Sequence, residues 1–518
     1  MMIVDKLRKA ILQSAVQGKL VPQDSNEESA SILLEKIKAE RAKLIKSGKI
    51  KKSKQEFGDI YRGEDGNWYE TIGKTSKDIT DEMPFDIPDS WRWVRLGSIS
   101  DVILGQSPDG STVNEAYQGI EFHQGKIFFG GTFLKKSTQY TSKPKKMVSS
   151  GTILLCVRAP VGIVNITERN ICIGRGLAGI NGILVSNWII FYFMKAFKKL
   201  IDSKAVGTTF VAITGDIVNN LLFPLPPLEE QKRIVAKLEE IKSFIDKYDQ
   251  TSKELDHLNE MTKKSILQSA VQGKLVPQDS NEESVSMLLE KIKAERAKLI
   301  KSGKIKKSKQ EFGDIHKGED GNWYETIGKT TKDITDEIPF DIPDSWRWVR
   351  LRDIGEIVGG GTPKTELKEN WENGTIPWVT PADMKLATKY INSGERYITE
   401  IGLKNSSAIL MPPNSIVYSS RAPIGYIAIT NNSLCTNQGC KSVIPYNFSS
   451  TEIIYYFLIA LTPEIKKRAS GTTFKEISGS KFGETLIPLP PLEEQKLIVE
   501  KIKILFRYIS ELKGAENE

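Results

Sequence analysis

The chain has 518 residues, a formal net charge of +8 and a pI near 8.9. This length exceeds what one hydrophobic core organises and predicts two to four domains, while the modest positive charge permits a polyanionic partner without requiring one. No window approaches the roughly 20 apolar residues of a membrane span and no apolar signal-peptide core follows the first methionines, so we expect a cytoplasmic protein.

Two helices and an irregular segment are predicted at the N-terminus. The first helix covers Ile3 to Gln17 and ends at a glycine. The second opens at the capping-box pattern Ser25-Asn-Glu-Glu, carries one apolar stripe and ends at Gly48. Residues 49–84 begin with a basic run and are then rich in Gly and Asp with few apolar anchors, which predicts a loose arm.

Two variable stretches, 91–227 and 346–491, are predicted to be globular α+β domains of about 135 residues, which is long enough to bury a core. Short β-type runs alternate there with Gly, Pro and Asn turns and with helical stretches. The β-type runs are 152–157, 162–166 and 416–418, and the helical stretches are 187–199 and 451–461.

The segment from Leu228 to about Gln272 is the predicted centre of the molecule, because its apolar residues follow a heptad spacing. The C-terminus repeats this spacing after the same entry sequence, Leu-Pro-Pro-Leu-Glu-Glu-Gln-Lys. We predict that the two seams form an antiparallel coiled pair; the alternative is that each helix covers its own neighbouring domain. The seam residues are Ile234, Leu238, Ile241, Ile245, Ile498, Ile502, Leu505, Ile509 and Leu512.

A long internal repeat relates the two halves of the chain. Residues 11–96 match residues 266–351 at a constant offset with only six differences, which indicates duplication. Two motifs persist beyond this block: Arg158-Ala-Pro matches Arg421-Ala-Pro, and Gly207-Thr-Thr-Phe matches Gly471-Thr-Thr-Phe. We therefore predict a pseudo-twofold repeat with a fixed and a variable part in each half. The predicted boundaries are 1–90, 91–227, 228–345, 346–491 and 492–518.

No catalytic constellation emerges from the sequence. Gly359-Gly-Gly-Thr-Pro-Lys-Thr resembles a phosphate-binding loop, but its proline removes an N–H that phosphates require, so a turn is favoured. The three histidines are too scattered for a metal site, and no metal is predicted. Four cysteines lack zinc-finger or secreted-disulfide spacing and are expected to be buried thiols: Cys156, Cys172, Cys435 and Cys440.

Two unlike domains on one helical spacer suit a DNA duplex, because ~30 to 45 helical residues span roughly 45 to 65 Å and DNA repeats every ~34 Å. Lys and Arg neutralise phosphates, while Gln and Arg read base edges with paired hydrogen bonds. A solvated surface charge is the ordinary alternative for each lysine, and a structural role for the matched arginines. The candidates are Gln124, Lys126, Lys135, Lys136, Lys143, Lys145, Lys146, Arg158, Arg175, Lys364, Lys368, Lys385, Arg421 and Gln438, with Lys389 and Arg396 as further basic residues.

An ordered set of motifs across both halves resembles the specificity subunit of type I restriction-modification systems. Each motif is weak alone, but the ordered set is highly specific. The motifs are Trp-Arg-Trp-Val-Arg-Leu at the start of each variable domain, Gly105-Gln-Ser-Pro-Asp-Gly-Ser-Thr, Phe122-His-Gln-Gly-Lys, Gly361-Thr-Pro-Lys-Thr with Trp378-Val-Thr, Arg421-Ala-Pro-Ile-Gly, and the two Leu-Pro-Pro-Leu-Glu-Glu-Gln-Lys helix entries.

The resemblance implies two target-recognition domains that each read half of a split, asymmetric DNA site, with the helices as spacer and docking surface. It also implies two modification subunits, which bind S-adenosylmethionine and methylate adenine, and restriction subunits, which translocate and cut DNA with ATP. Neither cofactor is expected on this chain. The alternatives are the specificity component of a different DNA-modifying system, a coiled-coil scaffold with two protein-binding domains and, least favoured, a stand-alone enzyme.

Overall fold

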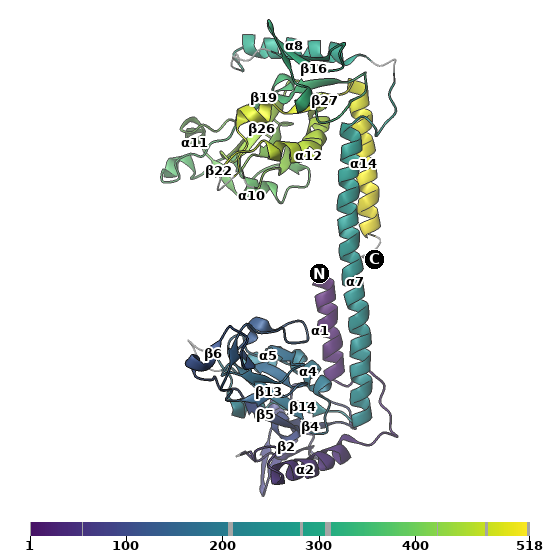
Figure 1. Ribbon diagram of the computed structural model, residues 1–518, viewed down its shortest axis with the longest axis vertical. Helices are drawn as coiled ribbons and strands as arrows, with labels where there is room; N and C mark the ends of the chain where they lie inside the picture. Colours follow the sequence, from purple (N-terminus) through teal and green to yellow (C-terminus); the bar gives the residue numbers. More distant parts are fainter. Residues whose placement is uncertain are drawn as a thin grey trace. The chain divides into compact units, whose positions relative to one another are not determined.

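The computed structural model describes residues 2–53, 55–205, 211–279, 283–305, 312–421, 423–471 and 475–514. Its polypeptide divides into two compact units, residues 1–253 and 254–518. The division falls within α7 (Leu228–Val271), a single helix of 44 residues that begins in the first unit and ends in the second (Figure 1). Within the described ranges, no helix is both long enough and apolar enough to cross a bilayer.

The first unit has the predicted α+β composition. Its fixed part contains α1 (Met2–Val16), α2 (Ala30–Lys46), β1 (Asp59–Arg62), β2 (Trp68–Ile72) and β3 (Thr75–Asp78). Its globular part contains β4 (Arg92–Arg95), α3 (Leu96–Ile99), β5 (Ser100–Leu104), β6 (Val113–Asn114), β7 (Ile120–His123), β8 (Tyr140–Thr141), β9 (Met147–Val148), β10 (Ile153–Cys156), β11 (Val164–Ile166), β12 (Ile171–Ile173), β13 (Leu177–Gly182), α4 (Asn187–Ala196), α5 (Lys198–Ser203), α6 (Gly215–Asn219) and β14 (Leu222–Leu225).

The second unit repeats this order in its fixed part and at both ends of its globular part, but two short α-helices interrupt the strands in the middle of the globular part. Its fixed part contains α8 (Val285–Lys301), β15 (Asp314–Lys317), β16 (Trp323–Ile327) and β17 (Thr330–Asp333). Its globular part contains β18 (Arg347–Arg350), α9 (Leu351–Ile354), β19 (Gly355–Gly359), β20 (Ile376–Val379), α10 (Pro381–Met384), β21 (Tyr390–Ile391), β22 (Arg396–Ile398), α11 (Glu400–Lys404), β23 (Ile416–Ser419), β24 (Ile427–Thr430), β25 (Cys435–Thr436), β26 (Cys440–Pro445), α12 (Thr451–Lys467), α13 (Gly479–Gly483) and β27 (Leu486–Leu489), and α14 (Leu492–Gly514) follows.

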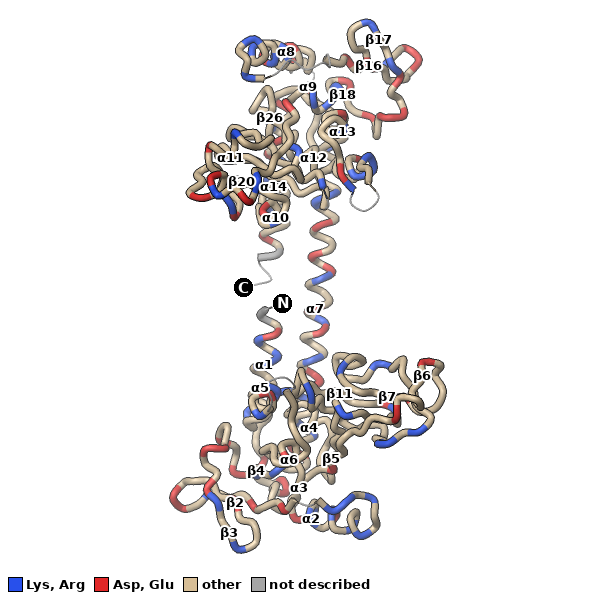
Figure 2. The backbone as a smooth tube through the Cα atoms, turned by 90° about the vertical axis from the view of Figure 1, so that its left-hand side faces the viewer, with Lys and Arg blue, Asp and Glu red and all other residues tan. Residues whose placement is uncertain are grey.

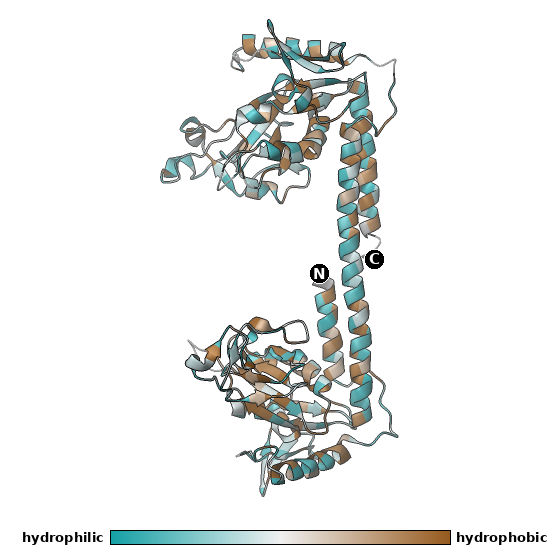
Figure 3. Cartoon of the chain, in the orientation of Figure 1, coloured by the Kyte–Doolittle hydropathy of each residue, from teal (hydrophilic) through white to brown (hydrophobic). Residues whose placement is uncertain are grey.

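The core of each unit lies between one apolar helix and a sheet that is antiparallel, except for the parallel edge strand β21 in the second unit. In the first unit the strand order is β11-β10-β13-β5, and α4 packs on β10, β11 and β13. In the second unit the order is β19-β26-β23-β24-β21, and α12 packs on β24. A second sheet in each unit contains one parallel pair, β7 with β12 and β20 with β25. Figure 3 shows hydrophobic residues gathered inside both globular parts and hydrophilic residues along much of α7.

The predicted helix boundaries are close to those observed, with one correction. The predicted helix from Ile3 to Gln17 is α1, and the glycine after it adopts a positive φ of 67°. However, α2 begins at Ala30 and not at Ser25. The reason is that Asp24 organises a turn of its own, in which the Asn26 amide donates to its carboxylate at 2.9 Å. In the second copy, residues 280–282 of the same pattern lie outside the described residues, as do 207–210 and 472–474 of the Gly-Thr-Thr-Phe motifs.

The segment predicted as a loose arm is a three-stranded antiparallel sheet in both units. It packs on the globular part through the buried residues Ile60 and Trp93 in the first unit and their repeats in the second. A buried ion pair adds to this contact: Arg95 of β4 meets Glu70 of β2 at 2.6 Å. The sequence prediction failed because these partners lie far apart in the chain and are too few to form an apolar pattern.

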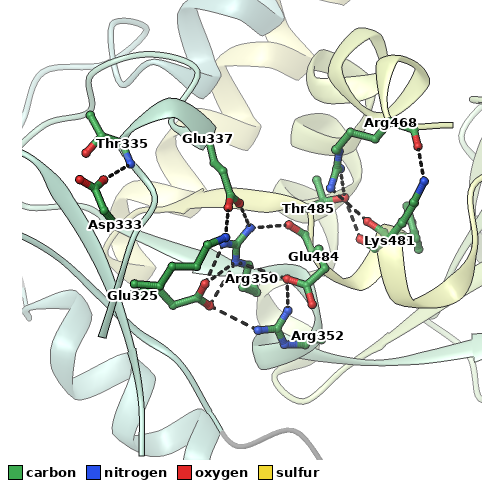
Figure 4. Close-up of polar contacts among 12 residues, drawn as sticks. Glu325, Asp333, Thr335, Glu337, Arg350, Arg352, Arg468, Lys481, Glu484 and Thr485 are labelled. Atoms are coloured by element: carbon green, nitrogen blue, oxygen red, sulfur yellow. Dashed lines mark hydrogen bonds and ion pairs between the residues drawn. The ribbon is translucent and has the colours of Figure 1, made fainter. Parts of the chain in front are cut away.

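The second copy of this contact is a larger polar network (Figure 4). Arg350 pairs with Glu325 at 2.7 Å and with Glu337 at 2.8 Å. Arg352 also contacts Glu325, at 3.3 Å, and pairs with Glu484. The first unit has a glycine at the position of Arg352, so its sheet is anchored by one arginine instead of two.

The helix α7 packs against α1 in the first unit. Ile234 and Leu238 are buried in the same cluster as residues of α1. Arg8 of α1 reinforces the contact, since it pairs with Asp246 and Asp249 at 2.9 Å. Figure 1 shows α1 beside the first half of α7. This half of the predicted seam therefore has its buried neighbours within its own unit.

In the second unit, α14 packs against the last turns of α7. Ile498 and Ile502 share a buried cluster with Leu267 and Val271 of α7, and Figure 1 shows the two helices side by side. The central and C-terminal helices do pair, but along this stretch of α7 and not along Ile234 to Ile245. Leu512, the last residue of the predicted seam, is 64% exposed.

The two Leu-Pro-Pro-Leu-Glu-Glu-Gln-Lys entries begin α7 and α14, as predicted. Their glutamates fasten the fixed part to each unit. Glu230 accepts from the indole of Trp91 at 2.8 Å and from Gln23 at 2.6 Å. Glu494 accepts in the same way from Trp346 at 2.9 Å and from Gln278 at 2.6 Å. Both junctions therefore consist of the same residue types in the same contacts.

Candidate nucleic-acid interface

Three loops meet at one edge of the first unit's globular part. They follow β5, β7 and β12. Because β7 and β12 are parallel neighbours, their carboxyl ends lie at the same edge. The Gly174 amide donates to the carbonyl of His123 at 2.8 Å, and the Gln106 amide donates to the carbonyl of Ile173 at 3.0 Å. We call this convergence of loops, and its counterpart in the second unit, the loop edge.

The loop edge brings together three of the predicted site residues, Gln124, Arg158 and Arg175, and all three are exposed. Gly176 allows this close approach, since a Cβ on it would lie 2.3 Å from the carbonyl oxygen of Gln124. The Val157 amide donates to the carbonyl of Gly176 at 3.0 Å, which places the arginine after it beside the same loop. These residues are 51 positions apart at the extremes, yet they share one surface.

The second unit has the same backbone hydrogen bonds at its loop edge. The Asn437 amide donates to the carbonyl of Val379 at 3.0 Å, and the Gly361 amide donates to the carbonyl of Thr436 at 2.8 Å. Gln438 therefore occupies the loop position that Arg175 has in the first unit. One backbone frame thus presents an arginine in one unit and a glutamine in the other.

The polar side chains of the second loop edge are held by neighbours. Gln438 accepts a hydrogen bond from the hydroxyl of Thr362. Arg421 pairs with Glu476 at 2.8 Å while its side chain stays 50% exposed. The residue before it fixes its position, because the Ser420 amide donates to the carbonyl of Gly439 at 2.8 Å. This bond matches the one from the Val157 amide to the loop edge of the first unit. The arginine that the two units share is thus oriented at the loop edge.

The predicted lysines of the first unit lie in two places. Lys145 pairs with Asp109 at 3.7 Å and the carbonyl of Lys146 accepts from β12, so this loop borders the loop edge. In contrast, the carbonyl of Lys135 accepts from Arg169 at 3.2 Å, which places Lys135 beside the start of β12. The remaining predicted lysines are also exposed: Lys126, Lys136 and Lys143. Figure 2 shows basic residues along the loops around β7.

The basic residues of the second unit differ in what they contact. Lys364 follows the loop edge directly, and Lys385 follows α10; both are exposed. Lys368 is exposed and pairs with Glu372 within its own turn at 3.4 Å. Lys389 is structural, since it pairs with Glu452 and lies against tyrosine rings. Arg396 stacks on Trp371 with 3.6 Å between the guanidinium carbon and the ring centroid.

A buried polar cluster that the sequence did not reveal supports β7. Glu121 accepts from Arg169 at 2.8 Å and from His123 at 2.9 Å, and the Ser137 amide donates to it at 2.8 Å. Burial by itself raises the pKa of Glu121, but these hydrogen bonds outweigh it and lower the pKa to about 2. Burial also lowers the pKa of His123. No sequence signal connects Glu121 with an arginine 48 positions away.

The four cysteines are free and buried, as predicted. Burial raises the pKa of the thiols of Cys156, Cys435 and Cys440 to about 12, so they stay protonated at neutral pH. A protonated thiol is neither a nucleophile nor a good metal ligand. Their position in the sheets is that of small apolar residues.

Comparison with known protein families identifies both globular parts. The type I restriction modification DNA specificity domain matches residues 88–257 and 343–518. The chain is 27% identical over an alignment of 603 positions to the EcoAI specificity subunit of Escherichia coli, covering 98% of this chain and 90% of that protein. It is 42% identical over 183 residues to the MjaIX specificity subunit of Methanocaldococcus jannaschii, covering 34% of this chain and 41% of that protein.

The fold has a counterpart among solved structures. A chain from a study of complex assembly and conformational transition of the type I R-M system aligns with a TM-score of 0.55 at 23% identity. The alignment covers 84% of this chain and 94% of that one. At this identity the likeness concerns the fold alone.

Proposed function

The chain belongs to the family of type I restriction-modification DNA specificity subunits, and from that premise we propose that its globular parts, 91–227 and 346–491, each read one half of a bipartite, asymmetric DNA site. In these systems the specificity subunit is the non-catalytic component that determines DNA specificity. Methyl transfer and cleavage then belong to other subunits, and this chain needs neither S-adenosylmethionine nor ATP.

The observation that carries this proposal is the common backbone frame of the two loop edges. Arg175 and Gln438 occupy the same place in that frame and differ in chemistry. An arginine reads guanine with two hydrogen bonds, whereas a glutamine reads adenine in the same way. Two similar folds with different side chains at this place recognise two different half-sites.

The remaining predicted residues have a sequence-independent role in this proposal. Lysines at the border of the loop edge neutralise phosphates and set the register of each domain on the duplex. The proposed contacts of this kind at the loop edge are Lys126, Lys143, Lys145, Lys146, Lys364, Lys368 and Lys385. Lys135 and Lys136, near the start of β12, are proposed to contact phosphates further from that edge. By contrast, the residues proposed to face bases or adjacent phosphates are Gln124, Arg158, Arg175, Arg421 and Gln438.

Exchange of the side chains at the matched position tests this function. Methylome sequencing of a host with and without the gene defines the site. Arg175→Gln is expected to change the preferred base at one position of one half-site, with about 1–3 kcal/mol of discrimination at stake. Gln438→Arg is the matched variant and should change the other half only. An altered preference in both halves, or in neither, contradicts the assignment.

The proposed partners are two modification subunits, joined by restriction subunits in the full complex. We infer that the duplicated helical blocks, residues 3–47 and 258–302, present equivalent docking surfaces because their sequences are nearly the same. Lys43→Glu with Lys46→Glu in α2 should lower the bound modification subunits from two to one in native mass spectrometry. The same reversal at Lys298 and Lys301 is the matched control and should give the same loss.

A coiled-coil scaffold with two protein-binding domains is the competing function. The two functions differ in their response to salt, because each neutralised phosphate releases counterions and the logarithm of DNA affinity falls linearly with the logarithm of salt concentration. Affinity for duplex DNA that is weak and unaffected by salt would favour the scaffold.

A further inference from the structure

We propose that Ile127 and Leu386 are specificity-determining residues, each making an apolar contact with the 5-methyl group of a thymine in its half-site. The inference rests on the proposed function, since it adds the apolar part of base readout to the polar part at the loop edge. Ile127 is 85% exposed and Leu386 is 83% exposed. Among the described residues the next most exposed large apolar side chain is Phe244, at 67%.

The two residues lie on the same loop of the two units. Ile127 follows β7, the strand that pairs in parallel with β12. Leu386 follows β20, the strand that pairs in parallel with β25. Both strands end at a loop edge, and the strands beside them lead to Arg175 and Gln438. Two unlike domains therefore carry their most exposed apolar side chain beside the position that we assign to base readout.

The first loop holds its exposed isoleucine in a defined place. Phe128 and Phe129, the next two residues, pack against the core cluster of the first unit. The ring of Phe128 also meets His123 edge to face at 5.6 Å. The Phe129 amide donates to the carbonyl of Lys126 at 2.9 Å and closes a tight turn. Ile127 is therefore the apolar side chain of this turn that stays in solvent, beside the exposed Lys126.

The second loop has the same design from different residues. Met384 is buried, and Ala387 packs against the same cluster. Thr380 and Asp383 form a capping box that starts α10. Leu386 is the apolar side chain of this loop that stays in solvent, beside the exposed Lys385. Because the backbone on both sides is fixed, ordering this side chain on a ligand costs little entropy.

The surroundings of both residues favour DNA over an apolar protein surface. Single exposed apolar residues are common, and a protein interface would need a contiguous apolar patch. Here the flanking side chains are those of Lys126 and Lys385, both exposed, which match a phosphate backbone. The thymine methyl is the apolar group that the major groove displays among base edges.

The test uses full-length chain and duplexes that carry the site defined by methylome sequencing. Each thymine is replaced in turn by deoxyuridine, which removes only the methyl group. For the wild type, one such replacement in each half-site should weaken binding by about 4-fold, the equivalent of one buried carbon. Ile127→Ala should weaken binding roughly 10-fold and lose the response in one half-site only. Leu386→Ala should lose the response in the other half.

The matched controls are Leu184→Ala and Phe448→Ala, whose side chains are 48% and 47% exposed. They follow the last residues of β13 and β26, at the ends of these strands that lie away from the loop edge. These should bind as the wild type does. Specific binding by the wild type with the same deoxyuridine response in all variants would overturn the inference and leave the proposed function standing. Absence of sequence-specific binding by the wild type would instead overturn the proposed function.

Discussion

A buried ion pair holds each three-stranded sheet on its globular part. The chain contains two versions of this ion pair, so each serves as the control for the other. Glu325→Gln removes a carboxylate whose side chain is 6% exposed and which binds Arg350 and Arg352. Breaking one partner out of a buried ion pair costs about 3–5 kcal/mol. Arg350 keeps Glu337 at 2.8 Å, so the loss of this one pair lies at the lower end of that range, and the lost contact with Arg352 adds to it.

Glu70→Gln is the matched change in the first unit. There only Arg95 loses a partner, and it keeps Glu82 at 2.9 Å. We expect about 3 kcal/mol for Glu70→Gln and about 1 kcal/mol more for Glu325→Gln, since two cations lose the shared carboxylate.

Hydrogen exchange measured by mass spectrometry reports the opening of each sheet separately. Peptides that cover β3 and β17 differ in mass because Ser76 is replaced by Thr331. A loss of about 3 kcal/mol corresponds to exchange that is roughly 100-fold faster in the altered sheet, with the other sheet unchanged. Equal acceleration in both sheets would mean global unfolding, and no acceleration would mean that the ion pair does not hold the sheet; either result refutes the reasoning.

Three further outcomes are expected. Deletion of residues 251–257 shortens α7 by about 10 Å. In methylome data this should change the number of base pairs between the two half-sites by about 3, while the sequence of each half-site stays the same. The stability that Glu121 gains from Arg169 should be present above pH 4.5 and be lost as the pH falls towards 2, and Glu121→Gln should flatten this part of the urea-unfolding profile. Ile502→Ala should destabilise the second unit by about 2–5 kcal/mol in thermal melts, whereas Leu512→Ala should change it by less than about 0.5 kcal/mol.

Helices and strands were predicted correctly where a local run of residues determines them. The apolar run at 152–157 is β10, and the helical stretch at 451–461 begins α12. The prolines before Leu228 correctly marked the start of α7. The near-identity of residues 11–96 and 266–351 likewise predicted that the elements of the fixed part are repeated in the two units.

The sequence-based prediction failed where the structure depends on which distant part of the chain an element packs against. A heptad pattern says that one face of a helix is buried but not what covers it, and Ile234 and Ile498 have different neighbours for that reason. The small sheets depend on contacts such as Glu70 with Arg95, which no local pattern encodes. Likewise, the loop edge exists only because β7 and β12 are neighbours in space.

The duplicated junctions have a consequence for how such genes change. Gln23 and Trp91 lie in the duplicated block, and Glu230 lies in the repeated helix entry. Gene conversion between the two copies would therefore produce hybrid proteins in which the residues at each junction keep the same contacts as before. A newly acquired globular part needs no compensating mutations at its borders, and under the proposed function a lineage can revise one half of its DNA target in a single genetic event.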